Sequence, residues 1–211
     1  MPYLLRVALP DVPGSLGRVA TAIGEAGGDI EAIEIVEHRH DGTAVDDVLL
    51  ETAPGVMPDS IVSACNQLDG VEVLWVSRYG AGGNLFLDLE AVETLTQAPE
   101  SALDQLVELL PLTFRADWAV RAQLTDGGVK VLHATSAAPD VGEEQSKWFP
   151  ITRAQRLDAP EQWGSIVAAA PVESAQELVA FGRRGGPDVL DSELARLQHL
   201  AALAVSISRT R

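Results

Sequence analysis

The first 78 residues alternate short apolar strands with amphipathic helices, and turn residues separate them. Apolar positions alternate with other residues from Tyr3 to Leu9, which predicts a strand with one well-buried face. They then recur at helical spacing from Leu16 to Ala26, and Gly27-Gly28 supplies the backbone freedom that ends a helix. Similar patterns predict strands over 29–38, 44–53 and 71–76, and a helix closed by Gly70 with Asp59 or Ser60 as its N-cap.

This order of elements, strand–helix–strand–strand–helix–strand, predicts an α+β fold of the ferredoxin-like type. Such a chain forms a four-stranded antiparallel sheet with both helices on one face. The other face is left bare, and a domain this small gains stability if a partner covers that face or a sheet edge.

The rest of the chain predicts a second domain with an antiparallel sheet flanked by helices. Helical periodicity runs from Leu85 to Leu95 and, after Pro99, from Leu103 to Leu110. Strands are expected over 118–124, 129–132, 149–157, 165–170 and 178–181, with a polar loop over 136–147. We therefore expect two domains, residues 1–79 and 85–211, joined by a glycine-rich linker at 80–84.

The last expected helix, from Ser192 to about Ser208 with Asp191 as its cap, is apolar on two sides. Its apolar side chains are Leu194, Leu197, Leu200, Ala201, Leu203, Ala204 and Ile207. One side can pack on the sheet of its own domain. We expect a helix of another subunit to cover the other side, because leaving a large apolar stripe in water is costly. The sequence thus predicts a homodimer or a larger assembly.

Composition and charge narrow the classes of partner. The chain has 211 residues, a formal charge of −16 and a pI near 4.5, which argues against nucleic acid or an anionic membrane. Its beginning lacks the basic region of a signal peptide, and no apolar run approaches 18 residues, so we expect a cytoplasmic protein. The single cysteine, Cys65, lies at helical spacing among apolar residues and predicts a core thiol.

The segment from Asp11 through Val12, Pro13, Gly14 and Ser15 to Leu16 is the most informative feature of the chain. It joins the first strand to the first helix, where backbone N–H groups lack partners and the helix dipole adds partial positive charge. Such a corner can hold a carboxylate without a catalytic side chain. It therefore favours a binding module over an enzyme.

Other candidate chemistry has simpler explanations. His38 and His40 flank a hairpin with Asp41, but no third metal ligand of suitable spacing is evident, so we expect no metal. The pair Asp46 and Asp47 is interpreted as part of a solvated edge strand. The glycines of the linker lack the third position of a dinucleotide-binding motif, so no cofactor is expected.

Residues 1–78 resemble an ACT domain. The resemblance rests on the element order, on Asp11-x-Pro13-Gly14-x-Leu16, and on Gly27-Gly28-Asp29-Ile30 at the start of the second strand. It implies that a small effector, typically an amino acid, binds at a subunit interface against residues 11–16. Asp29 and Ile30 would line the facing side, often from a neighbouring subunit. The family commonly has Asn where Asp29 stands, and an ionised Asp accepts hydrogen bonds only, which suits an ammonium group.

Residues 85–211 resemble a GAF-like domain less specifically. The resemblance rests on the leading helices, the meandering sheet and the ending Phe181-Gly182-Arg183-Arg184-Gly185-Gly186-Pro187. GAF domains bind small ligands or serve in dimerisation. The loops after Thr135 and Leu157 are short, so we expect a reduced domain with a structural and dimerising role.

The sequence thus predicts a non-enzymatic, dimeric regulatory or sensor protein. Its ligand would be an amino acid with its carboxylate on the N–H groups of residues 14–16 and its ammonium on Asp29 or Asp11. A downstream protein, unknown from the sequence, would receive the signal. Two alternatives stay open: a scaffold with degenerate ligand sites, and a regulatory subunit of an amino-acid metabolic enzyme.

Overall fold

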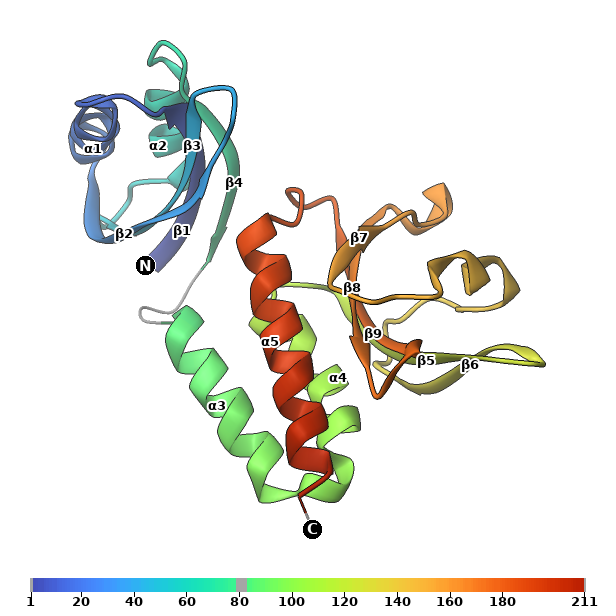
Figure 1. Ribbon diagram of the computed structural model, residues 1–211. Coiled ribbons are helices and arrows are strands. Elements are labelled where there is room, and N and C mark those ends of the chain that lie inside the picture. Colours follow the sequence, from blue (N-terminus) through green and yellow to red (C-terminus); the bar gives the residue numbers. More distant parts are fainter. Residues whose placement is uncertain (1, 79–82, 211) are drawn as a thin grey trace. The chain divides into compact units, whose positions relative to one another are not determined.

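The computed structural model describes residues 2–78 and 83–210, with side chains from residue 87 onward in the second range (Figure 1). The chain divides into two compact units, Met1–Gly83 and Asn84–Arg211, which are described separately below. The expected linker at 80–84 falls mainly on residues 79–82, which lie outside the described part of the chain. Gly83 and Asn84 begin a helix.

The N-terminal unit has the predicted element order and an antiparallel sheet. Its elements are β1 (Pro2–Pro10), α1 (Ser15–Glu25), β2 (Gly28–His38), β3 (Thr43–Thr52), α2 (Pro58–Asn66) and β4 (Glu72–Arg78). The strand order is β2-β3-β1-β4, and every neighbouring pair is antiparallel. The predicted caps of the second helix were wrong: α2 begins at Pro58, whose missing N–H is harmless in a first turn, and Met57 precedes it.

Both helices of this unit pack on one face of its sheet (Figure 1). The core between them joins alternate residues of the central strands to α1 and α2: Leu5, Val7, Leu9, Val19, Ile23, Val48, Leu50, Ile61, Cys65 and Val71. Cys65 is buried in this core, as its spacing predicts. Because successive side chains of β1 point to opposite faces of the sheet, every second residue of this strand faces the helices.

The interpretation of Asp46 and Asp47 as part of a solvated edge strand was wrong. β3 lies between β2 and β1, and each of the two residues is 2% exposed. Arg6 on β1 pairs with Asp47 in register, and its guanidinium donates to both carboxylate oxygens, Nε to Oδ1 at 2.7 Å and Nη2 to Oδ2 at 2.9 Å. Asp46 points to the opposite face of the sheet, toward the helices, because successive strand residues alternate.

The C-terminal unit contains three long helices and a five-stranded sheet. Its elements are α3 (Gly83–Gln97), α4 (Ala102–Thr113), β5 (Trp118–Thr125), β6 (Gly128–Ala134), β7 (Gln155–Leu157), β8 (Ser165–Val172), β9 (Ser174–Arg184) and α5 (Asp191–Ser208), with 3₁₀ turns η1 (Pro99–Ser101), η2 (Glu143–Trp148) and η3 (Glu161–Trp163). The strand order is β6-β5-β9-β8-β7, antiparallel throughout. The fold class predicted for both units, α+β with antiparallel sheets, is confirmed.

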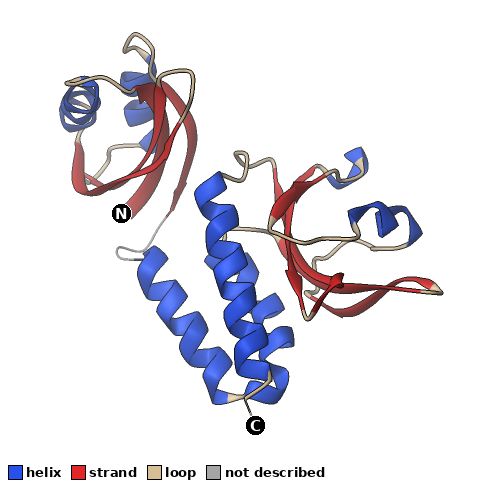
Figure 2. Cartoon of the chain, viewed as in Figure 1, coloured by secondary structure: helices blue, strands red, loops and turns tan. Residues whose placement is uncertain are grey.

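The sheet of this unit separates two apolar layers (Figure 2). The long helices lie on one face and the short turns on the other. The expected strand over 149–157 is shorter, because Pro150 has no N–H to donate and Phe149 and Ile151 turn into the second layer. The expected polar loop at 136–147 contains the start of η2.

The apolar helix at the end of the chain, α5, is covered on parts of both sides within its own unit. α5 is buried against the sheet through Leu197, Leu200 and Ala204, and α4 of the same unit packs along it. Leu194 and Ile207 are half-buried against the same core, and Leu203 stays 43% exposed. α4 of the same unit thus covers part of the second side, and the helix of another subunit expected there stays a prediction. No helix in the described ranges combines the length and hydropathy that a membrane span requires.

Candidate functional site

The turn between β1 and α1 is held by backbone hydrogen bonds. Asp11 N–H donates to the Gly42 carbonyl at 2.8 Å, which ties the turn to the β2–β3 hairpin. Ser15 N–H donates to the Val12 carbonyl at 3.2 Å. Gly14 has φ +91°, a left-handed conformation that a side chain would strain, so glycine is required here by backbone geometry.

The N-terminus of α1 is open in the described part of the chain. No side chain caps it, and its first turn carries no acidic residue. The first intrahelical bond runs from Arg18 N–H to the Gly14 carbonyl, so the amides of Leu16 and Gly17 precede the helical ladder. The sequence prediction needs one revision, because the Ser15 amide is already used within the turn. Leu16 and Gly17 are thus the amides available to an anion.

A surface hollow of about 370 Å³ lies along this end of α1. It is lined by Gly14, Gly17, Arg18, Thr21, Ala22, Glu25 and Leu68. Its volume is within the range of about 300–1,000 Å³ that small-molecule sites commonly have. The hollow thus places an exposed arginine and an open helix start beside one another.

Two acidic side chains at the edge of this site, the predicted contact Asp11 and its neighbour Asp41, are already engaged. Asp11 Oδ2 lies 2.8 Å from His38 Nδ1, and both side chains are largely exposed. Asp41 accepts hydrogen bonds from the hydroxyl and the backbone N–H of Thr43, which lower the pKa of its carboxyl. Among the described residues no cluster of three metal-ligating side chains is present.

A buried carboxyl group lies behind the turn. Asp46 pairs in register with Val7, so it faces the helices, and burial raises the pKa of its carboxyl. His38 acts in the opposite direction on that pKa, while Asp11 and Asp47 raise it further. Within the described chain, Asp46 Oδ1 and the Ser15 hydroxyl oxygen are both buried without a hydrogen-bond partner. Buried polar atoms of this kind are uncommon and call for an explanation.

Asp29 and Ile30 lie at the other end of the sheet from the turn. Asp29 pairs with Glu51, and Glu51 pairs with Pro2 at the beginning of β1. The turn follows Pro10 at the opposite end of that strand. Within one chain the structure therefore brings Asp11–Leu16 together but leaves Asp29 and Ile30 apart from them.

Sequence reasoning missed three residues of this site: Gly17, Arg18 and Asp46. Gly17 and Arg18 follow the recognised motif by one and two positions, so extending the motif through the first helical turn would have included them. For Asp46 a signal was present in Arg6, because an arginine inside an apolar alternating strand needs a buried acid on the neighbouring strand. That acid is Asp47, which makes β3 an interior strand and buries Asp46 as well.

On the second face of the C-terminal sheet, side chains of the described residues occupy the interior. Trp118, Trp148 and Trp163 pack edge to face there, with centroid distances of 5.6 and 5.9 Å. Gly182 is required beneath them, because a Cβ atom would lie 2.1 Å from the indole of Trp118. A hollow lined by residues 140–145, 160, 162 and 163 measures only about 220 Å³.

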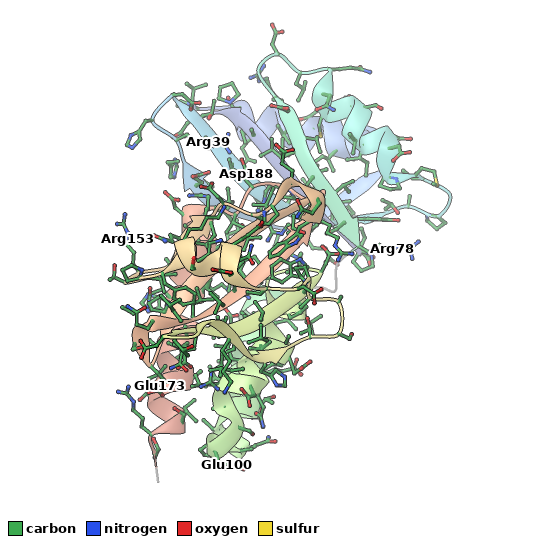
Figure 3. All side chains as sticks on the ribbon, turned by 90° about the vertical axis from the view of Figure 1, so that its right-hand side faces the viewer. Arg39, Arg78, Glu100, Arg153, Glu173 and Asp188 are labelled. Atoms are coloured by element: carbon green, nitrogen blue, oxygen red, sulfur yellow. The ribbon has the colours of Figure 1, made fainter. Side chains whose placement is uncertain are left out.

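A larger hollow of about 440 Å³ lies between β7 and the start of α5. Its polar groups are mostly engaged with one another: Arg156 pairs with Asp191, and Gln198 accepts a hydrogen bond from Ala154 N–H. Arg153, also in its lining, extends outward from the fold (Figure 3). This arrangement fastens β7 to α5.

Comparison with solved structures finds matches to GAF domains. The GAF domain of a protein described as a sensor histidine kinase from Pseudomonas syringae pv. tomato matches at 16% identity and TM-score 0.45, covering 59% of this chain and 85% of that chain. The GAF domain of Acinetobacter phosphoenolpyruvate-protein phosphotransferase matches at 11% identity and TM-score 0.46, covering 61% and 94%. The chromophore-binding domain of a bacteriophytochrome from R. palustris matches at 8% identity and TM-score 0.46, covering 97% and 92%.

A search of curated proteins found no match. The family model of the ACT domain matches residues 3–56. This range includes β1, the turn, α1, β2 and β3, and so contains both the open helix start and Asp46. The N-terminal unit of this chain therefore carries an ACT domain.

Proposed function

We propose that this protein is a non-enzymatic regulatory or sensor protein whose ACT domain binds an amino acid at the start of α1. The observation that carries the proposal is the uncapped helix N-terminus beside a hollow of ligand size. The ligand carboxylate accepts hydrogen bonds from the amides of Leu16 and Gly17, and the Arg18 guanidinium adds positive charge nearby. In a chain of net charge −16, this is a local site suited to an anionic group.

Asp29 and Ile30 join this site only if a second chain supplies them. They lie on β2, an edge strand whose other end reaches the turn. A two-fold axis that pairs the β2 edges antiparallel would bring Asp29 of one protomer toward the turn of its partner. We therefore propose a homodimer in which each site is shared between protomers.

A thermal-shift panel of the twenty common amino acids tests the proposed function. A ligand at 100 times its Kd should raise the unfolding free energy by about 2.7 kcal/mol, which is visible as a higher Tm. The full chain is used, and organic acids without an amino group are included for comparison. If no amino acid changes the Tm at millimolar concentration, the proposed function is wrong.

Position 17 offers a matched pair of variants for locating the site. Gly17→Pro removes an amide that lies outside the helical ladder, whereas Gly17→Ala keeps it, and a Cβ there meets no atom within 4 Å. We expect the proline variant to lose the amino-acid response and the alanine variant to keep it. Equal responses from both would place the ligand carboxylate elsewhere.

Light scattering at micromolar concentration tests the homodimer. We expect twice the monomer mass, and we expect Ile35→Lys to reduce it, because Ile35 is a large apolar residue on the β2 edge with 51% exposure. Leu203→Lys is the matched control, since it changes an exposed apolar residue on α5. A monomeric parent protein would remove the shared site from the proposal.

A scaffold that assembles partners without a ligand is the second candidate function. The observation in its favour is the aromatic packing on the second face of the C-terminal sheet, where side chains occupy the interior. It would gain support if neither amino acids nor cyclic nucleotides shift the Tm and the protein still forms a stable dimer.

A further inference from the structure

The hollow between β7 and the start of α5 carries hydrogen-bond donors that the fold leaves unused. Its volume of about 440 Å³ is within the range of small-molecule sites. None of its lining residues belongs to the aromatic layer on the second face of the C-terminal sheet. The lining consists of Arg153, Ala154, Gln155, Arg156, Asp191, Leu194, Ala195 and Gln198.

The lining of this hollow is positively charged, although the whole chain has a net charge of −16. Two arginines, Arg153 and Arg156, stand against a single acid, Asp191. Asp191 is also the first residue of the 18-residue helix α5, whose N-terminus adds partial positive charge at this end. The second acid of that first turn, Glu193, is buried and paired with Arg183. The hollow therefore favours an anionic ligand.

Two of the donor groups are held in place by the fold. Arg156 Nε donates to the Val189 carbonyl at 2.6 Å, and Arg156 Nη2 lies 2.9 Å from Asp191 Oδ1. Gln198 Oε1 accepts a hydrogen bond from Ala154 N–H at 2.7 Å. Among the described residues, Arg156 Nη1 and Gln198 Nε2 have no hydrogen-bond partner. Donors fixed in this way lose little freedom when a ligand binds.

Arg153 supplies a further donor group. It has no hydrogen bond or ion pair with any described residue, and its side chain extends outward from the fold (Figure 3). It can therefore turn onto a bound anion without breaking an existing contact. Its planar guanidinium carries five N–H donors, whose geometry matches phosphate and carboxylate oxygens.

We propose that this hollow binds a small phosphate monoester. The phosphate group has three acceptor oxygens and nearly two negative charges at neutral pH. Asp191 already competes for Arg156, and a dianion has the advantage over a single carboxylate in displacing it. Leu194 and Ala195 provide apolar contacts for the carbon part of the ligand. The site lies in the C-terminal unit and is independent of the proposed amino-acid site.

Proton–nitrogen correlation NMR of the full chain, with inorganic phosphate as the probe, tests this site. The amide resonances of Ala154 and Ala195 report on the hollow, and those of Leu16 and Gly17 report on the start of α1. At about pH 7.5, where phosphate is mostly a dianion, we expect saturable shifts of Ala154 and Ala195. Sodium acetate at the same ionic strength should bind there at least about tenfold more weakly.

Either of two results would overturn the proposal: phosphate leaves the Ala154 and Ala195 resonances unchanged, or acetate binds there as tightly as phosphate. Changes at Leu16 and Gly17 bear only on the proposed amino-acid site. The two proposals can therefore fail separately.

Charge variants with opposite expected effects locate the phosphate group. Arg153→Gln should weaken phosphate binding about tenfold, as expected for losing a charged donor. Asp191→Asn should strengthen it, because Arg156 loses its competing carboxylate. Both side chains are exposed, so the fold should tolerate both changes. Arg209→Gln is the matched control, since it removes an exposed positive charge just beyond the other end of α5. An Arg153→Gln protein that binds phosphate as tightly as the parent refutes the site.

A phosphorylated segment of a partner protein is the competing occupant. Glycerol phosphate and a short phosphoserine peptide are titrated against the same resonances. We expect the peptide to bind no more tightly than glycerol phosphate, because the donors surround only one small hollow. A peptide that binds at least about a hundredfold more tightly overturns the small-ligand assignment in favour of a protein partner.

Discussion

The two units differ in the hydrogen-bond partners that they provide for the start of a helix and for a buried acid. In the C-terminal unit, Glu193 accepts a hydrogen bond from Leu190 N–H at the start of α5 and another from the buried Arg183. In the N-terminal unit, α1 starts with no side-chain cap in the described residues, and Asp46 is buried with an unpartnered oxygen. In the C-terminal arrangement the buried acid and the start of the helix are paired within the fold, which contributes to stability. The N-terminal arrangement leaves polar groups without a partner among the described residues, as the proposed binding site requires.

The comparison extends to the interior of each sheet. The second face of the C-terminal sheet is occupied by tryptophan, phenylalanine and isoleucine side chains. The hollow beside α1 is open and is lined by one face of α1, with Arg18 and Glu25, and by Leu68. We infer that amino-acid recognition belongs to the N-terminal unit and that the second face of the C-terminal sheet is specialised for a stable fold.

The largest expected effect comes from breaking the buried pair of Arg6 and Asp47 in the sheet of the N-terminal unit. Arg6→Met leaves Asp47 buried without its guanidinium, and we expect the N-terminal unit to lose about 3–5 kcal/mol of stability. Hydrogen exchange of the β1 and β3 amides in the full chain measures this loss. The double variant Arg6→Met/Asp47→Leu should recover most of it, and a stable single variant would contradict the pairing.

A smaller loss is expected from Gly182→Ala in the C-terminal unit. The added Cβ overlaps the indole of Trp118, and overpacking of this kind costs about 1–3 kcal/mol. Urea unfolding followed by tryptophan fluorescence measures the change, with Gly127→Ala as control because a Cβ there meets only Thr125 Oγ1 at 3.8 Å. Amino-acid binding should be unchanged. Loss of binding in Gly182→Ala would mean that the units do not divide their roles as inferred.

Unlike the two preceding variants, Asp46→Asn should raise the stability of the unliganded protein. It removes a buried charge whose Oδ1 has no hydrogen-bond partner among the described residues, and we expect a gain on the order of 1 kcal/mol at pH 7. Hydrogen exchange of the β3 amides measures it. A loss of stability would show that the carboxylate is compensated in the free protein.

Asp46 also predicts the direction in which folding stability changes with pH. Burial raises the folded-state pKa of Asp46 above its ordinary value of 3.8, so the folded state binds the proton more tightly than the unfolded state. The Asp46 contribution to stability is therefore fully present below pH 3.8 and is lost as the pH rises through the folded pKa. The free energy of unfolding is measured for the parent and for Asp46→Asn across a pH series. Relative to the variant, the parent should lose stability between pH 3.8 and the folded-state pKa, and the difference between the two should be constant at higher pH.

The smallest expected effect is a gain of about 0.5 kcal/mol from Gly17→Ala, because alanine loses less backbone entropy than glycine in a helix. Thermal unfolding measures it. A Cβ at this position meets no atom within 4 Å, so a destabilised variant would indicate that Gly17 contacts something outside the described residues.

Much of the fold followed from patterns that act over short distances along the chain. Period-two alternation in β1 and helical spacing in α1 identified these elements, because the side chains that pack together are set by local geometry. The strand expected at 149–157 failed because Pro150 interrupts hydrogen bonding while the apolar residues beside it pack elsewhere. Apolarity alone does not distinguish a buried strand from a buried turn.

The amino-acid sequence by itself determined the ferredoxin-like order of the first unit and the turn that opens α1. Both depend on neighbouring residues: the alternation of β1, and the left-handed backbone that Gly14 permits. Only the tertiary structure decided that β3 is an interior strand, that Asp46 lies behind the turn, and that Asp29 lies far from it. The physical reason is that strand order and register bring together residues that are distant along the chain. Whether a charged side chain is buried depends on these pairings and not on the residues next to it in the sequence.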